Sequence, residues 1–343
     1  MSSISNRLDV AVSSLDGKMN GAAGIADSRG GLRPRFAYTR ALGVLGLGAC
    51  ALSGLVFGGV PWWAARRIIH PMGAEPLPQD LDEALDVGVD ARPEKVEFSG
   101  LDGHKLEGWF VPGPDPGKAP WPVVLLVYGY GGYKEQMVSY AGILHSGGFA
   151  TMMFDMPGSG RRRGQPVTLG FRERWDLIAA ARYLRSRPEV DPERIGVLGV
   201  SMGAATAILG AADEPSIKAV VSDSAYADLT EMVKPGVKAF LGLPAFPFAP
   251  IIARYAEVMI GAKASDIVPK RAVADLGDRP ILVIHGADDT LVSPDSAHKI
   301  FAEAPGPKEL WMVPDCPHGQ APAVAPEEYK ARVNGFFSRW LDS

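Results

Sequence analysis

The sequence contains little cysteine, with two residues, Cys50 and Cys316, among 343. Cys50 lies in an uncharged apolar run, and Cys316 lies far along the chain in a polar stretch. No intrachain disulfide is therefore expected, and the fold does not depend on one. The chain also lacks internal repeats and any grouping of residues at the spacing of metal ligands, so neither a metal nor another cofactor is expected.

Basic clusters with interleaved aromatic residues are missing as well, and the formal net charge is −4. Such clusters are the electrostatic signature of nucleic-acid binding, which is therefore excluded as a function class. The length allows one folded domain of about 250 residues with further segments before it.

The most informative feature present is a strand-forming run that ends in Gly-x-Ser-x-Gly around Ser201 and then becomes rich in alanine, as in a helix. A serine at a sharp strand-to-helix turn exposes its hydroxyl, and Gly199 and Gly203 remove Cβ atoms that would clash there. The first amides of the following helix face a developing oxyanion. The pattern predicts Ser201 as a nucleophile.

A nucleophilic serine needs an acid and a base, and both occur downstream. A buried strand beginning at Pro280 runs into a polar turn, where we assign the acid to Asp289. Asp288 remains an alternative, because adjacent residues in a turn point in different directions. The next strand, from Glu309 to Pro314, leads into a loop with His318, the expected general base.

The other histidines fit the role of base less well, and His285, at the end of a strand, is expected to serve packing.

Upstream, the run from Val123 to Gly132 is typical of a strand with a glycine-rich exit that lets a backbone amide approach a substrate carbonyl. The expected oxyanion hole is formed by the backbone N–H groups of Tyr130 and Met202.

Four segments occur in the order found in the α/β-hydrolase superfamily: the glycine-rich strand exit, the turn at Ser201, the strand before Asp289 and the loop with His318. With the helical segments between them, they resemble that superfamily over roughly residues 93 to 340. The Asp102-Gly103 hairpin resembles the branch of serine aminopeptidases and prolyl-oligopeptidase-like domains, several of which carry one N-terminal membrane helix. The resemblance implies an α/β fold with a mostly parallel central sheet flanked by helices and a helical cap. It also implies the same nucleophile, acid, base and oxyanion donors: Ser201, Asp289, His318, Tyr130 and Met202.

Two positions depart from the family pattern. The third strand usually exits through His-Gly, whereas this chain has Tyr128-Gly129, so a hydrogen bond that organises the loop must be replaced or lost. The turn after the fourth strand usually reads Gly-x-Gly-x-Ser, and here the run from Gly158 and Gly160 into Arg161, Arg162 and Arg163 puts arginine where serine is common. Neither change touches the expected triad.

The run from Ala41 to Val60 has no charged residue and is long enough to cross a hydrocarbon core of about 30 Å as a helix. We expect a transmembrane helix there, with Trp62 and Trp63 as interfacial anchors. More arginines precede the run than closely follow it, which predicts a cytoplasmic N-terminus and a catalytic domain on the outer side of the membrane. Opposite topology and a buried soluble helix are the alternatives.

The remaining segments are assigned by composition. Residues 1–40 are expected to form a flexible tail, residues 61–92 a linker or docking segment rich in acids, and residues 93–343 the hydrolase domain, with a cap at about residues 226–278. The apolar centre of the cap, with Phe240, Phe246 and Phe248, suits either a wall for an acyl chain or packing between cap helices. A third possibility is insertion into the bilayer interface. Arg161 is a candidate for binding an anionic group, with a solvated loop as its alternative.

The sequence therefore predicts a membrane-anchored serine hydrolase that cleaves a carboxylic ester, a thioester or a lipid-like substrate through an acyl-enzyme. An aminopeptidase or amidase with the same triad is the enzymatic alternative. A catalytically silent binding protein with the same fold is the non-enzymatic alternative.

Overall fold

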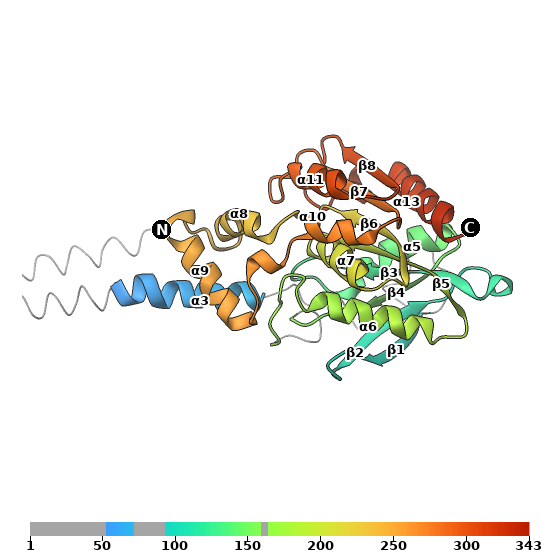
Figure 1. Cartoon of the computed structure of the whole chain (residues 1–343), viewed down its shortest axis with the longest axis horizontal. Coiled ribbons are helices and arrows are strands. Elements are labelled where there is room, and N and C mark those ends of the chain that lie inside the picture. Colours follow the sequence, from blue (N-terminus) through green and yellow to red (C-terminus); the bar gives the residue numbers. More distant parts are fainter. Residues whose placement is uncertain (1–52, 72–92, 159–163, 343) are drawn as a thin grey trace, which may run out of the picture. The chain divides into compact units, whose positions relative to one another are not determined.

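The computed structural model describes residues 53–71, 93–158 and 164–342 (Figure 1). The predicted tail, most of the predicted membrane span, residues 72–92 of the predicted linker and Arg161 lie outside these residues. The described part of the chain is built around one sheet of eight strands in the order β1-β2-β4-β3-β5-β6-β7-β8. The strands are β1 Glu94–Ser99, β2 Lys105–Val111, β3 Trp121–Val127, β4 Ala150–Phe154, β5 Val190–Val200, β6 Ile217–Asp223, β7 Ile281–Gly286 and β8 Lys308–Val313.

The apolar patterns of the strands match their places in the sheet. β3, β4 and β7 are buried along their whole length, as expected of parallel strands covered on both faces. β1 alternates toward its end between exposed and buried residues and lies at the sheet edge. β1, β2 and β4 pair antiparallel, and all pairs from β4 through β3 to β8 are parallel. The predicted mostly parallel sheet is confirmed.

Helices cover both faces of this sheet (Figure 1). α5 and α13 pack together against central strands, and α6 and α7 pack together against the other side of the same region. The α-helices are α3 Val60–Ile69, α5 Val138–Ser146, α6 Glu173–Arg185, α7 Met202–Asp213, α8 Leu229–Leu241, α9 Ala245–Ile260, α10 Pro269–Ala272, α11 Asp295–Glu303, α12 Ala321–Val324 and α13 Pro326–Leu341. Shorter turns are the π-helix η1 Leu55–Gly59 and the 3₁₀ helices η2 Pro116–Lys118, η3 Lys134–Met137, η5 Ala264–Asp266 and η6 Val273–Leu276.

α8 and α9 are inserted between β6 and β7, in the part of the chain where a cap was predicted. α9 packs against α3, the helix that follows the predicted membrane span, and α3 buries Ala64 and Ala65 against Ala249 and Ile252 (Figure 1). Together these three helices form a separate apolar cluster beside the sheet.

Within the described residues, no single helix is both long and apolar enough to cross a membrane. α8 and α9, bent by 105° at their junction, reach that length and hydropathy only as a pair. The predicted span at 41–60 is described only from Ser53 onward, where the chain is helical.

Candidate functional site

Ser201 lies at the sharp turn between β5 and α7. Its backbone is in an unusual conformation, with φ 57° and ψ −118°, and its amide donates a hydrogen bond of 2.8 Å to the carbonyl oxygen of Asp223 on the neighbouring strand. A Cβ on Gly203 would collide with the carbonyl oxygen of Val127, and one on Gly199 would collide with that of Gly203. The two glycines therefore permit the turn that holds the serine hydroxyl out of the sheet.

The structure brings three of the predicted site residues into one hydrogen-bonded chain. Nε2 of His318 lies 2.8 Å from Oγ of Ser201, and Nδ1 of His318 lies 2.6 Å from Oδ2 of Asp289. Asp288, the alternative acid, is exposed, and its amide donates to the carbonyl oxygen of Cys316. Of the two adjacent acids, Asp289 is the one that faces the histidine.

The carboxylate of Asp289 is buried and accepts several hydrogen bonds. Its Oδ1 receives the amides of Leu291 at 2.9 Å and Val292 at 2.8 Å. Its Oδ2 faces Nε2 of His285 at 3.2 Å as well as His318. Burial alone raises the pKa of Asp289, but the hydrogen bonds from His285, His318 and the amide of Val292 outweigh it and lower the pKa below its usual value. Asp289 therefore stays ionised while facing the imidazole.

His285 is the residue that sequence reasoning missed, since it was expected to serve only packing. Its side chain is fully buried at the end of β7, and its Nε2 also lies 3.1 Å from the carbonyl oxygen of Val292. Both neighbours of Nε2 accept hydrogen bonds, so Nε2 carries the hydrogen. The available signal was a lone polar residue at the end of an otherwise apolar strand, four positions before Asp289.

A second buried carboxyl lies next to the site at the end of β6. Asp223 accepts hydrogen bonds from Oγ of Ser224 at 2.9 Å and from the hydroxyl of Tyr329 at 3.2 Å. Burial, opposed by these two hydrogen bonds, raises its pKa to about 6. Ser224 in turn accepts the amide of Gly319 at 3.2 Å, which connects Asp223 to the loop that carries His318.

The exit of β3 is organised by Tyr128, the residue that replaces the family's histidine. The amide of Met156, after β4, donates to the Tyr128 hydroxyl at 2.6 Å. Nearby, the buried Nζ of Lys134 lies 2.6 Å from Oδ2 of the buried Asp155. Burial raises the pKa of Asp155 against the opposing effect of Lys134. The tyrosine hydroxyl and the ion pair thus tie the β3 exit to the β4 exit.

Both predicted oxyanion residues border the nucleophile. Met202 is the first residue of α7, so its amide is among those that have no acceptor within the helix. Tyr130 follows Gly129, where a Cβ would lie only 3.3 Å from Cβ of Ser201. The hydroxyl of Tyr130 donates to the carbonyl oxygen of Ile68 at 2.6 Å, and burial raises its pKa to about 12.

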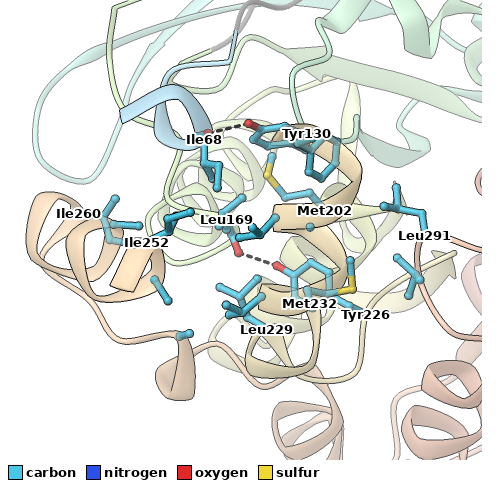
Figure 2. A pocket seen from close by; sticks show the side chains of 18 of the residues that line it. Ile68, Tyr130, Leu169, Met202, Tyr226, Leu229, Met232, Ile252, Ile260 and Leu291 are labelled. Atoms are coloured by element: carbon cyan, nitrogen blue, oxygen red, sulfur yellow. Dashed lines mark hydrogen bonds between the residues drawn. The ribbon is translucent and has the colours of Figure 1, made fainter. Parts of the chain in front are cut away.

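An apolar cavity of about 130 Å³ opens beside Ser201, between the loops at the sheet edge, α8, α9 and the end of α3 (Figure 2). Figure 2 shows Ile68, Leu169, Met202, Leu229 and Ile252 around it. The two tyrosine hydroxyls in its wall are both engaged by backbone carbonyls: Tyr130 by Ile68, and Tyr226 by Leu169 at 2.5 Å. The cavity therefore offers hydrophobic contact and few hydrogen bonds.

The tentative substrate residues fall in different places. Phe240 of α8 lines this cavity and packs beside Tyr130, with ring centroids 5.3 Å apart and ring planes tilted by 54°. Phe246 is 84% exposed and Phe248 packs within the cluster of α3, α8 and α9, and neither lines the cavity. Arg161 lies outside the described residues. Among the described residues, no group of His, Cys, Asp or Glu side chains is arranged to hold a metal ion.

Comparisons with known proteins agree with this fold. Residues 102–241 match the family model of X-Pro dipeptidyl-peptidases, the S15 family. The chain is 30% identical over 279 residues to the uncharacterized protein Rv2307c of Mycobacterium tuberculosis, covering 81% of this chain and 88% of that protein. It is 28% identical over 232 residues to the uncharacterized protein YfhR of Escherichia coli K12, covering 66% and 73%.

Among solved structures, the esterase Pf2001 of Pyrococcus furiosus is similar, with 28% identity and a TM-score of 0.63, over 78% of this chain and 99% of the esterase. The sheet order, the serine at the turn after β5 and these similarities lead to one assignment. The chain is a hydrolase of the α/β-hydrolase superfamily and belongs to the same family as Rv2307c.

Proposed function

We propose that this protein is a serine hydrolase that cleaves a carboxylic ester or thioester with an apolar acyl group. The observation that carries the proposal is the hydrogen-bonded chain from Ser201 through His318 to Asp289 at the edge of an apolar cavity. Nδ1 of His318 donates its hydrogen to Asp289, which leaves Nε2 free to accept the proton of the Ser201 hydroxyl.

In the first half of the reaction, Oγ of Ser201 attacks the acyl carbon while Nε2 of His318 takes its proton. The carbonyl electrons move to oxygen, and the amides of Met202 and Tyr130 stabilise the oxyanion. When the intermediate collapses, the bond to the leaving alcohol or thiol breaks, and His318 returns the proton to it. A water, deprotonated by His318, then hydrolyses the acyl-enzyme.

The lining of the cavity favours an acyl group over a peptide N-terminus. An aminopeptidase must bind a free ammonium, which requires a carboxylate near the nucleophile. Glu257 is the one carboxylate among the cavity-lining residues that the structure describes, and it is occupied by the amide of Ala264 at 3.1 Å and by Arg254 at 3.6 Å. The similarity to the S15 family still makes peptide cleavage the alternative to test.

We further propose that the apolar run 41–60 anchors the protein in a membrane with the hydrolase on the outer side. The uncharged run and the arginines before it support this placement. Protease added to intact cells is expected to remove the hydrolase domain. If the domain is digested only after the membrane is opened, the topology is the reverse.

Labelling with a fluorophosphonate probe tests the proposed chemistry. The expected adduct maps to Ser201 by mass spectrometry, is lost in Ser201→Ala and is kept in the matched control Ser146→Ala, which alters an exposed serine of α5. A panel of esters, thioesters and amino-acid arylamides then separates the substrate classes. Folded wild type that takes no label would instead be a silent binding protein, and cleavage of arylamides without esters would make it a peptidase.

A further inference from the structure

Large apolar side chains on the surface are concentrated on a few elements. Seven of the ten that are exposed in the described part of the chain belong to η1, α3, α8 and α9: Leu55, Phe57, Trp62, Trp63, Phe240, Phe246 and Val258. We call these seven residues the apolar surface. Exposing so many large apolar side chains on neighbouring elements is unfavourable in water, and such a surface marks contact with a partner or with lipid.

The cap helices have the composition of lipid-contacting helices without the geometry of a straight span. α8 and α9 together reach the length and hydropathy of a membrane-crossing segment, but they are bent by 105°. On α9, the exposed positions Pro250, Arg254 and Val258 recur every four residues, which places them on one face, while Ile252 and Ile260 are buried. Phe246 is exposed too, at the kink where the backbone of α9 is not helical. An apolar helix pair of this shape suits the plane of a bilayer interface.

The charge on these helices also distinguishes a lipid surface from a neutral partner. α3, α8 and α9 carry Arg66, Arg67, Lys234, Lys238 and Arg254, against two acids, Glu231 and Glu257. Glu231 is already paired with Lys270 and Lys299, which lie outside these three helices. The helices are therefore basic on a chain whose net charge is −4, which is complementary to anionic headgroups.

The apolar surface meets the cavity beside Ser201 at Phe240, which belongs to both. Ile68 of α3 and Phe240 of α8 both line that cavity, and Tyr130 of the β3 exit is hydrogen-bonded to Ile68. η1 and the first residue of α3 form the last part of the uncharged run 41–60. α3, α8 and α9, which bear five of the seven residues of the apolar surface, thus also border the cavity.

From these observations we infer that η1, α3 and the bent pair α8–α9 dock on a bilayer with anionic headgroups and hold the cavity mouth at its interface. The docking stands independently of the reaction, whereas the supply of an ester substrate from the lipid phase rests on the proposed function. The acyl chain of the substrate would then pass from the lipid phase into the cavity between α3 and α8 without crossing water.

The position of the surface can be measured on the full chain in vesicles, without any enzymatic assay. Cys50 and Cys316 are replaced by serine, and an environment-sensitive fluorophore is attached at Val258→Cys or at the matched control Val324→Cys, an exposed valine of α12 away from these helices. In phosphatidylcholine vesicles that contain phosphatidylglycerol, the label at 258 is expected to shift to the blue and to be quenched by nitroxide lipids, while the label at 324 is not.

Two results would overturn the inference. A label at 258 that is no more quenched than the label at 324 would show that α9 does not reach lipid. Disulfide-linked dimers through Val258→Cys, with no quenching by nitroxide lipids, would assign the apolar surface to a second copy of the chain. The quenching at 258 is expected to be lost when phosphatidylglycerol is left out. Equal quenching with and without phosphatidylglycerol would refute the proposed attraction between the basic residues and anionic headgroups.

Activity separates docking from chemistry. The double variant Trp62→Ser and Trp63→Ser removes two exposed rings of α3 that do not line the cavity, and Trp175→Ser removes a comparably exposed ring on α6. Hydrolysis of a long-chain ester embedded in vesicles is expected to fall about tenfold or more in the double variant alone. Hydrolysis of a short soluble ester is expected to stay unchanged in both. If wild type hydrolyses neither ester, the proposed function is refuted. The fluorescence result alone then decides whether the helices dock on the bilayer.

Discussion

Removing the imidazole of His285 is expected to slow the proposed reaction without removing any group of the triad. His285 is fully buried, and its Nε2 donates toward Oδ2 of Asp289 at 3.2 Å, the same oxygen that faces His318 at 2.6 Å. We therefore describe His285 as a positioning residue that fixes the carboxylate of Asp289 in the orientation that His318 requires.

The size of the effect follows from the contacts of Asp289. Its carboxylate faces four donors, and the one from His285 is the longest. A hydrogen bond to a charged group contributes about 1.5–3 kcal/mol, and the long geometry selects the lower end. At about 1.4 kcal/mol for each factor of ten, His285→Leu is expected to reduce kcat/KM about tenfold. The same variant leaves the buried carbonyl oxygen of Val292 without this donor, so a loss of stability of about 1–3 kcal/mol is expected too.

Rescue by a conservative variant distinguishes positioning from a merely structural defect. Leucine at position 285 removes the donor to Oδ2 of Asp289, whereas glutamine keeps an amide donor on a side chain of similar length. The assay is kcat/KM on a short soluble ester for folded wild type, His285→Leu and His285→Gln.

The glutamine amide can place a donor near the position of Nε2, so His285→Gln is expected to recover most of the rate. Equal impairment of the leucine and glutamine variants would refute the argument, because it would mean that a donor to Asp289 is not what matters. A leucine variant with wild-type kcat/KM would refute it as well.

Three further outcomes are expected. Gly203→Ala drives a Cβ into the carbonyl oxygen of Val127 and should lower stability to urea by about 3 kcal/mol, whereas Gly335→Ala, where a Cβ meets nothing, should not. Lengthening the acyl chain of a soluble ester should raise kcat/KM about fourfold per methylene, because burying each methylene contributes about 0.8 kcal/mol. The rise should stop when the cavity of about 130 Å³ is full. A kcat/KM that does not change with chain length would contradict the acyl site. Because the pKa of Asp223 is raised to about 6, its protonated form is favoured in the fold, so stability falls by about 3 kcal/mol as pH rises from about 4 through 6. Asp223→Asn should lack that fall, and identical pH curves for the two proteins would disprove it.

The parts of the fold that sequence could predict are those with local signals. The buried strands have apolar runs, and the turn at Ser201 needs glycines on both sides because backbone carbonyls approach there. The order of strand, turn and helix then predicts the parallel sheet, since short connections between such units leave few topologies. Asp289 and His318 were predicted in the same way, from loops that follow neighbouring strands.

The contacts that sequence could not predict join residues with no local relation. Tyr130 and Ile68 are separated by 62 positions, and nothing in either segment indicates that the helix after the predicted span forms a wall of the cavity. The choice among Phe240, Phe246 and Phe248 depends on the phase of α8 and on the bend between α8 and α9, which apolar composition does not determine. His285 differs from an ordinary packing residue only through its distance to Asp289.

α3 follows the proposed membrane anchor in the sequence and contacts two loops of the candidate site. Val167, in the loop before α6, donates its amide to the carbonyl oxygen of Ile69 at 2.7 Å, and Tyr130 donates its hydroxyl to that of Ile68. One of these contacts holds the loop beside the nucleophile, and the other holds the loop that carries Leu169 in the cavity wall. α3 therefore holds the β3 exit through one hydrogen bond and the loop before α6 through another, without passing through the sheet. For this reason α3, although it precedes the hydrolase domain in the sequence, belongs to the wall of the candidate substrate site.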